Sequence, residues 1–405
     1  LIAALRLLDI GRGDEVIVPA MTFIATATSV SMVGATPVFA DVDATSGCLT
    51  AQTVEAGRTE KTKAVIPVHI GGWPWNMVRK RITKKTKAVI GGHLFGQSYD
   101  PGLIELCERK NLGLIEDAAQ AHGTSVIING KKRMAGSLGD IACFSFFPSK
   151  NMAVGGEGGM ITTNDRAIGN RMKSIINHGR DGTLQSQEVG TNMRMSEVFA
   201  AIGRKQLEHL DQWLEIRRNA AEQYASAVEN NPLITPPSTF PNSEHGWHQY
   251  CVKVEDSAHF IEYMSEKNID ARVFYSTPCH QHPVYATHPQ YNETIDVTES
   301  ICAQIVAVPI HHGLTNEMFN RFHETVDSFI EEGFKNIILA GHSSGGWQSI
   351  KIKAEFPKLV KGVIGLNPGA GGTVKNRKDW PWWEDVRLSL IHISEPTRQA
   401  EISYA

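Results

Sequence analysis

The sequence predicts an α/β protein whose main sheet is largely parallel. Short apolar runs alternate along the chain with longer segments in which apolar residues recur at helical spacing. The runs are apolar throughout, as in strands that helices cover on both faces of a sheet. Strands that alternate with helices favour parallel pairing through helical crossovers. The strands we expect in this sheet are residues 16–18, 37–40, 112–116, 141–146 and 159–163.

A second, smaller α+β domain is expected after the sheet. From Ser196 a long helical pattern begins, with Val198, Ile202 and Leu214 among its apolar positions. We expect this pattern to carry the chain out of the large domain. The elements expected beyond it are a strand at 249–254, a helix at 259–264 and a closing helix from about 316 to 331.

One segment of the chain occurs twice. Residues 61–69, Lys-Thr-Lys-Ala-Val-Ile-Pro-Val-His, recur at 85–93 as Lys-Thr-Lys-Ala-Val-Ile-Gly-Gly-His. A repeat architecture would show three or more copies, so two adjacent copies indicate a local duplication or a faulty join. We expect one copy to occupy the sheet and the other to be displaced. The second copy is favoured, because the residues after it lead directly to Asp117.

The composition excludes several classes of protein. The chain has 405 residues, 41% of them hydrophobic, and a formal net charge of -3, which does not indicate nucleic-acid binding. Its apolar runs are too short to cross a bilayer, and its start does not have the pattern of a secretion signal. The six cysteines are scattered without a CxxC pair, which favours free thiols in a reducing compartment. We therefore expect a cytoplasmic protein with no nucleic-acid or membrane partner.

Two neighbouring motifs carry recognisable chemistry. Lys150 lies in Ser-Phe-Phe-Pro-Ser-Lys-Asn, and the run Ile-Glu-Asp-Ala-Ala-Gln-Ala-His that contains Asp117 lies upstream. A lysine amine can form a Schiff base with an aldehyde, and a carboxylate can hold a protonated pyridine nitrogen. The hydroxyl of Ser145, just before the lysine, can bind a phosphate. Together these groups meet the needs of pyridoxal 5'-phosphate (PLP).

These motifs resemble the DegT-like sugar aminotransferases, which are fold-type I PLP enzymes. Residues 13–26 and 190–194 are also similar to motifs of that family, and the resemblance covers about residues 1–330. It implies a PLP-binding large domain at 1–215 and a small domain at 216–331. In the family a Gly-Thr-like turn precedes the first helix and holds the cofactor phosphate. Since Leu1 already lies in a helical pattern, we expect the phosphate site to lack that turn.

The resemblance gives a role to each residue near the lysine. Lys150 would form the Schiff base, Asp117 would hold the pyridine nitrogen, and Gln120 would contact the cofactor's phenolic oxygen. Ser145 would bind the phosphate. Each residue also has an ordinary alternative: Asp117 could cap a helix starting at Ala118, and Ser145 could simply face solvent.

More distant residues complete the implied site. Phe23 would stack on the cofactor ring, although an aromatic residue in an apolar loop is often part of the core. Asn192 would contact the phosphate across a dimer, which implies a homodimer with a shared active site. Tyr275 and His280 resemble the family's substrate-facing loop. We expect no metal site, because the histidine pair around residue 281 has no third ligand at a suitable spacing.

The implied reaction moves an amino group from an amino acid, with glutamate the expected donor, to a nucleotide-linked keto sugar. Such chemistry belongs to cell-envelope polysaccharide biosynthesis. Two alternatives come from the same resemblance. One is a non-catalytic PLP-fold regulator. The other is a PLP-dependent sugar dehydratase, against which Lys150 argues, since that branch carries histidine at this position.

The C-terminal part changes character near residue 332. A strand at 334–340 enters Gly-His-Ser-Ser-Gly, which resembles the nucleophile elbow of an α/β-hydrolase with Ser343 as the nucleophile. We interpret residues 332–387 as an incomplete hydrolase fragment ending in a strand near 363–366, because the acid, the histidine and the oxyanion donor have no place in it. Serine hydrolysis is therefore a further, weaker alternative. Residues 388–405 resemble the translation of a transposase-type sequencing adapter, which makes them an artefactual tail.

Overall fold

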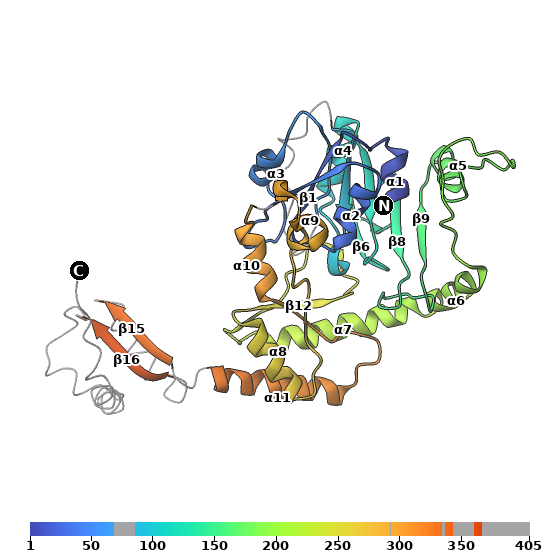
Figure 1. The fold of residues 1–405 in the computed structure, drawn as a ribbon. Helices are drawn as coiled ribbons and strands as arrows, with labels where there is room; N and C mark the ends of the chain where they lie inside the picture. The colour runs from blue at the N-terminus through green and yellow to red at the C-terminus, as the bar shows by residue number, and fades with distance from the viewer. Residues whose placement is uncertain (69–85, 292, 334–336, 343–359, 367–405) are drawn as a thin grey trace, which may run out of the picture. The chain divides into compact units, whose positions relative to one another are not determined.

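A computed structural model describes residues 1–68, 86–291, 293–333, 337–342 and 360–366. The chain divides into two compact units, Leu1–Phe322 and His323–Ala405 (Figure 1). None of the helices in these residues is long and apolar enough to span a membrane.

The first unit is built on a seven-stranded sheet with the order β2-β1-β3-β4-β5-β8-β9. All neighbouring strands run parallel except β8 and β9, which pair antiparallel. The predicted mostly parallel sheet is therefore confirmed. The strands are β1 (Glu15–Pro19), β2 (Thr36–Ala40), β3 (Thr62–Val65), β4 (Ala88–Gly92), β5 (Gly113–Asp117), β8 (Ile141–Ser145) and β9 (Gly159–Thr162).

Helices pack around this sheet, and their sequences explain where they begin and end. In α4, Leu103, Leu106 and Cys107 form one buried face at helical spacing, and Asn111 ends the helix in the left-handed conformation. In α5 the Asp165 carboxylate caps the first turn by accepting from two backbone N–H groups. The helices are α1 (Ile2–Leu7), α2 (Ile24–Met32), α3 (Ala51–Gly57), α4 (Gly102–Lys110) and α5 (Arg166–Ile175).

The prediction that one copy of the repeated segment is displaced is wrong. Both copies are strands of the main sheet: β3 comes from the first copy, β4 from the second, and they pair side by side. The physical reason is that the two copies have the same β-branched, apolar centre and therefore the same tendency to form a buried strand. The second copy lies beside the strand that ends in Asp117, since β4 pairs with β5.

The rest of the first unit holds a four-stranded sheet with the order β10-β12-β14-β13 and a three-stranded sheet with the order β11-β6-β7. The expected strand at 249–254 is β12 and the expected helix at 259–264 is α8. The long helical pattern expected from Ser196 forms two helices, α6 (Glu197–Leu207) and α7 (Leu210–Val228), separated by Glu208 and His209. The domain limits at 215 and 331 remain a prediction.

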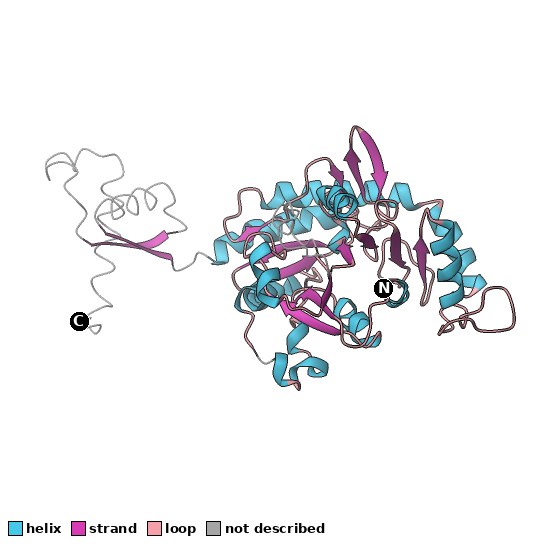
Figure 2. Cartoon of the chain, turned by 90° about the horizontal axis from the view of Figure 1, so that it is seen from above, coloured by secondary structure: helices cyan, strands magenta, loops and turns pink. Residues whose placement is uncertain are grey.

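The bounds of the elements in this part of the chain are as follows. The strands are β6 (Ser125–Ile128), β7 (Lys131–Met134), β10 (Ile234–Thr235), β11 (Ser243–Glu244), β12 (Tyr250–Val254), β13 (Arg272–Val273) and β14 (Ile305–Val308). The α-helices are α6 (Glu197–Leu207), α7 (Leu210–Val228), α8 (Ser257–Glu266), α9 (Pro283–Ala286), α10 (Asp296–Gln304) and α11 (Asn316–Gly333). Short 3-10 turns lie at η2 (Leu94–Gly96), η3 (Cys279–Gln281) and η4 (Pro289–Tyr291). Figure 2 shows the helices and strands from a second direction.

The second unit contains two described strands, β15 (Ile337–His342) and β16 (Val360–Leu366), which pair in parallel. They fall where the sequence predicts the two strands of the C-terminal fragment. Ser343 and residues 388–405 lie outside the described residues. The assignment of this part to a hydrolase fragment with an adapter-derived tail therefore remains a prediction.

Candidate functional site

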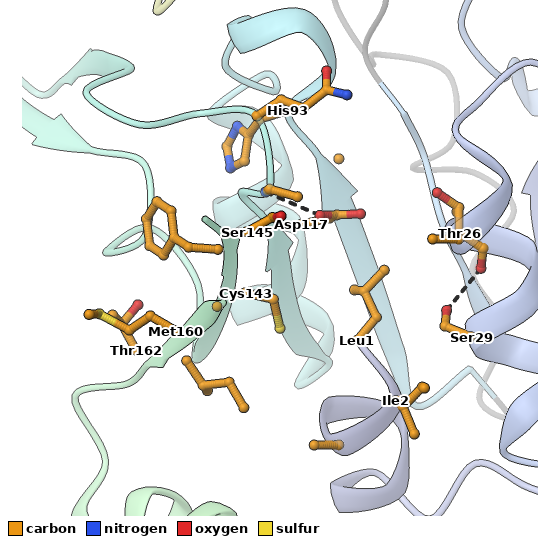
Figure 3. Close-up of a pocket in the computed structure, with 18 of the residues that line it drawn as sticks. Leu1, Ile2, Thr26, Ser29, His93, Asp117, Cys143, Ser145, Met160 and Thr162 are labelled. Carbon is orange, nitrogen blue, oxygen red and sulfur yellow. Dashed lines mark hydrogen bonds between the residues drawn. The ribbon is translucent and has the colours of Figure 1, made fainter. Parts of the chain in front are cut away.

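A large cavity of about 1450 Å³ opens at the carboxyl ends of the main-sheet strands. In open parallel sheets this edge is the usual place for a ligand site. Figure 3 shows part of its lining, with Asp117, Cys143 and Ser145 on one side and Thr26 and Ser29 on the other. Of the eight site residues predicted from the sequence, six line the cavity: Phe23, Asp117, Gln120, Ser145, Lys150 and Tyr275.

Asp117 is the last residue of β5. Its carbonyl oxygen accepts a hydrogen bond from the backbone of His93 at 3.1 Å. One carboxylate oxygen accepts from the backbone of Ala119 at 3.3 Å, and the residues that follow form a turn. The alternative role for Asp117, capping a helix that starts at Ala118, is therefore excluded.

Glu116, the residue before Asp117, fixes the end of β5 through hydrogen bonds to its buried carboxylate. Its side chain is completely buried and accepts four hydrogen bonds: from His93 Nε2 at 3.0 Å and from three backbone N–H groups of residues 136–139 at 2.6–2.8 Å. Burial would raise the pKa of Glu116, but these hydrogen bonds, led by that of His93, lower it. The buried carboxylate therefore stays ionised and fixes the end of β5.

Lys150 lies in the turn after β8. Its backbone N–H donates to the carbonyl of Phe147 at 2.9 Å, and its half-buried side chain lines the cavity. Burial lowers the pKa of Lys150, and the carboxylate of Asp117 acts in the opposite direction. The Ser145 hydroxyl accepts from the backbone of Phe147 at 3.4 Å, and this side chain also borders the cavity.

Gln120 connects two walls of the cavity. Its carbonyl oxygen accepts from the backbone of Phe95 at 2.6 Å, and its amide nitrogen donates to the Tyr275 hydroxyl at 3.1 Å. The Tyr275 ring lies 5.8 Å from the ring of Phe23 and 6.2 Å from the ring of Phe95, centroid to centroid. Both ends of the Gln120 amide are thus engaged, and burial raises the pKa of Tyr275.

Two buried histidines near Lys150 were not assigned a role from the sequence. His122 packs between the rings of Phe144 and Phe146, at 5.4 and 5.7 Å. Burial, and next the positive charge of Lys150, lower the pKa of His122 to about 4. His248 lines the cavity, its pKa lies well below the usual range for the same two causes, and its backbone N–H donates to Phe95. His122 is the last residue of the Asp117 motif, whereas nothing in the local sequence singles out His248.

Two predicted residues, Asn192 and His280, do not line the cavity. Asn192 is exposed and forms an isolated bridge with Asn177. His280 is buried against Phe39, and its Nε2 lies 3.1 Å from a carboxylate oxygen of Glu299. Within the described parts of the chain, no three histidine, cysteine or acidic side chains gather as a metal site would require.

The fold, with a lysine and an aspartate facing one cavity at the end of its sheet, is that of the PLP-dependent aminotransferases of fold-type I. The chain belongs to the DegT/DnrJ/EryC1/StrS aminotransferase family, which it matches over residues 1–79 and 75–327. The two matched segments overlap at residues 75–79, between the copies of the repeated segment.

Three similar proteins illustrate the range of this family. The chain is 36% identical over 321 residues to a UDP-N-acetyl-3-dehydro-alpha-D-glucosamine 3-aminotransferase of Acidithiobacillus ferrooxidans, with 79% of each chain covered. It is 33% identical over 314 residues to the erythromycin biosynthesis sensory transduction protein EryC1 of Saccharopolyspora erythraea, with 78% of each covered. Among solved structures it is similar to S. venezuelae DesV in complex with a ketimine intermediate, with 33% identity, a TM-score of 0.69 and 81% of each chain covered.

Proposed function

We propose that this chain is a PLP-dependent aminotransferase that moves an amino group from an amino acid, with glutamate as the donor, to a keto sugar carried on a nucleotide. The observation that carries the proposal is the convergence of Lys150 and Asp117 on one large cavity. The nucleotide-sugar aminotransferases among the family's relatives support the choice of substrate.

The residues present fit PLP. The half-buried Lys150 offers an amine for the cofactor's aldehyde, and its burial favours the neutral, reactive form of that amine. Asp117 offers a carboxylate for the protonated ring nitrogen, Gln120 an amide, and Ser145 a hydroxyl for the phosphate. PLP, when bound, supplies the electron sink that makes the donor's α-hydrogen acidic.

The protein's own part in the reaction is to orient groups and to move a proton. The amine of Lys150, once free, accepts the proton from the donor's α-carbon as a general base and returns a proton as a general acid. Asp117 keeps the ring nitrogen protonated, because its negative charge favours the charged form of a neighbouring base. Each half of the reaction releases one product before the second substrate enters, so ping-pong kinetics are expected.

The finer assignments belong to the same proposal. Asn192 would reach the site of a second copy, so the active form would be a homodimer with shared sites. The exposed apolar side chains of Leu184, Val189 and Val198 support a covered surface in this region. Phe23 would stack on the cofactor, and Tyr275 and His280 would face the substrate loop. The protein would be cytoplasmic and would serve polysaccharide biosynthesis.

A non-catalytic regulator is the second candidate, because one relative is named as a sensory transduction protein. The same assay separates the two. Amine transfer from glutamate should vanish in Lys150→Ala and persist in Lys110→Ala, which changes an exposed lysine of α4. Full transfer by Lys150→Ala would refute the proposed mechanism. If the protein shows no amine transfer and its regulatory binding is unchanged in Lys150→Ala, it is a regulator. Ester cleavage that is lost in Ser343→Ala would indicate the hydrolase alternative.

A further inference from the structure

The two copies of the repeated segment are not only neighbours; they lie in register. Ala64 pairs with Ala88 and Val65 with Val89, so both of these β3 residues lie opposite their own counterparts in β4. Residues 61–66 and 85–90 have the same sequence. β3 and β4 therefore present the same backbone and side chains at the edge that faces β1 in the strand order.

β1 could pair with β4 as it now pairs with β3. Thr62, Ala64 and Val65 are the β3 residues that pair with β1. Two further backbone bonds join the strands, from Glu15 N–H to the Lys61 carbonyl at 2.9 Å and from Ile66 N–H to the Ile17 carbonyl at 2.8 Å. The second copy repeats every one of these β3-side residues, as Lys85, Thr86, Ala88, Val89 and Ile90.

The reverse exchange is blocked. β4 ends in Gly91 and Gly92, which pair with Glu116 and Asp117 of β5. A Cβ atom at Gly91 would lie 2.5 Å from the ring of Tyr99, and the first copy has Pro67 at the matching position. β3 therefore cannot replace β4 as the partner of β5. β4, in contrast, carries every residue that β3 uses to pair with β1, so it can replace β3 as the partner of β1.

The extra strand changes the width of the cavity. Phe23 follows β1 and Asp117 ends β5, and both Val68 and Gly92 line the floor between them. Neighbouring strands lie about 4.8 Å apart, so three spacings separate β1 from β5 by about 14 Å, against about 10 Å for two. Stacked rings need centroids about 4.5–7 Å apart. The one additional strand spacing between β1 and β5 is therefore as large as the distance between two stacked rings, so it is enough to separate the Phe23 ring from a ring held at the Lys150 wall.

We propose that β3 is a spacer that holds the Phe23 wall of the cavity one strand away from the Lys150 wall, and that the chain without residues 61–84 closes its sheet around β4 and retains PLP more tightly. The cofactor half of this inference rests on the proposed function; the closure of the sheet does not. In the shortened chain Glu60 is followed by Lys85-Thr86-Lys87, the same residues that follow it now.

A distance measured without cofactor tests the closure. Spin labels at Met32→Cys on α2 and Arg109→Cys on α4 stand on either side of β3, both positions are exposed, and all six native cysteines are buried. Since β1 connects to β2 and β4 connects to β5 in opposite directions along the sheet, right-handed crossovers place α2 and α4 on opposite faces. We therefore expect the label distance to shorten by about 2–3 Å in the shortened chain, the projection of one strand spacing on that distance. If the shortened chain folds but the label distance is unchanged, β3 does not act as a spacer.

The matched control removes the same length from the other copy. Deletion of residues 70–93 joins His69 to Leu94 and places Pro67 where Gly91 stands, so we expect the folded population of this variant to fall sharply. A deletion of 70–93 that closes the sheet as well as the deletion of 61–84 would contradict the assignment of β3 as the dispensable copy.

PLP titration followed by absorbance tests the cofactor half. The dissociation constant should fall about three- to tenfold in the shortened chain, the scale of one recovered aromatic stack. Phe23→Leu should weaken binding more in the shortened chain than in the full chain. Equal PLP affinity of the two chains would overturn the link between width and binding. If neither chain binds PLP, the predicted gain in PLP affinity is refuted together with the proposed function. The label distance then tests by itself whether β3 holds β1 and β4 apart.

Discussion

The buried carboxylate of Glu116 offers a direct test of how the site is supported. In Glu116→Gln the shape is kept, but one of the two acceptor oxygens becomes an NH2 group. Oε1 accepts from Leu138 and Gly139, and Oε2 accepts from His93 and Gly136, so two buried N–H groups would face a donor whichever way the amide turns. His93 cannot adapt freely, since its Nδ1 already accepts from the backbone of Tyr99 at 3.3 Å.

The expected cost of Glu116→Gln is about 3–5 kcal/mol of unfolding free energy, from two unsatisfied buried donors and a broken buried pair. Urea unfolding followed by far-UV circular dichroism measures it. Glu244→Gln is the control: that carboxylate is 45% exposed and pairs with Lys132 at 2.6 Å, so its loss should cost about 0–1 kcal/mol. A cost for Glu116→Gln as small as for the control would show that the four hydrogen bonds to Glu116 do not stabilise the folded protein.

The pH dependence of the same difference follows from the lowered pKa of Glu116. A carboxyl group whose pKa is lower in the folded protein contributes stability above its unfolded pKa and loses that contribution as the pH falls. The gap between the wild type and Glu116→Gln should therefore be full at pH 7 and shrink below about pH 4.5, the ordinary value for a glutamate. A gap that widens on acidification would contradict the ionised state of the buried carboxylate.

The remaining predictions concern three residues around the cavity. Asp117→Asn should slow amine transfer about 100-fold or more, the scale of one lost preorganised electrostatic contact, and near-normal kcat would contradict its role. His122 has a pKa of about 4 in the folded protein against an ordinary 6.5, so on acidification the unfolded chain binds the proton first, and the unfolding free energy should fall by about 3 kcal/mol between pH 6.5 and pH 4. The urea midpoints at pH 7 and pH 5 should therefore differ less in His122→Leu than in the wild type. An equal loss of stability in both proteins would exclude His122 as its cause. Tyr275→Phe removes the hydroxyl that accepts from Gln120 and should cost about 1 kcal/mol of stability in the same urea assay, with no change expected if that bond is absent in solution.

Local sequence was sufficient for much of the fold. Five of the seven main-sheet strands, β1, β2, β5, β8 and β9, fall on short runs that were predicted as strands without knowledge of their partners. The residues at the centre of the site were also accessible, because Asp117, Gln120, Ser145 and Lys150 lie in short motifs whose chemistry fits one cofactor. All four line the cavity.

What the sequence could not give depends on contacts between distant residues. The bond between Gln120 and Tyr275 joins positions 155 residues apart, and His248 reaches the cavity from a segment with no motif of its own. The fate of the repeat was mispredicted for a related reason. Equal sequences have equal strand propensity, and which strand pairs with which is decided by edges and side chains elsewhere in the sheet.

The visible absorbance spectrum of the purified chain tests directly whether Lys150 binds PLP and begins transamination. After addition of PLP and dialysis, we expect a retained yellow band that bleaches when glutamate is added, and no retained band in Lys150→Ala. A folded wild-type chain that stays colourless after dialysis, or a band that survives in Lys150→Ala, would contradict it.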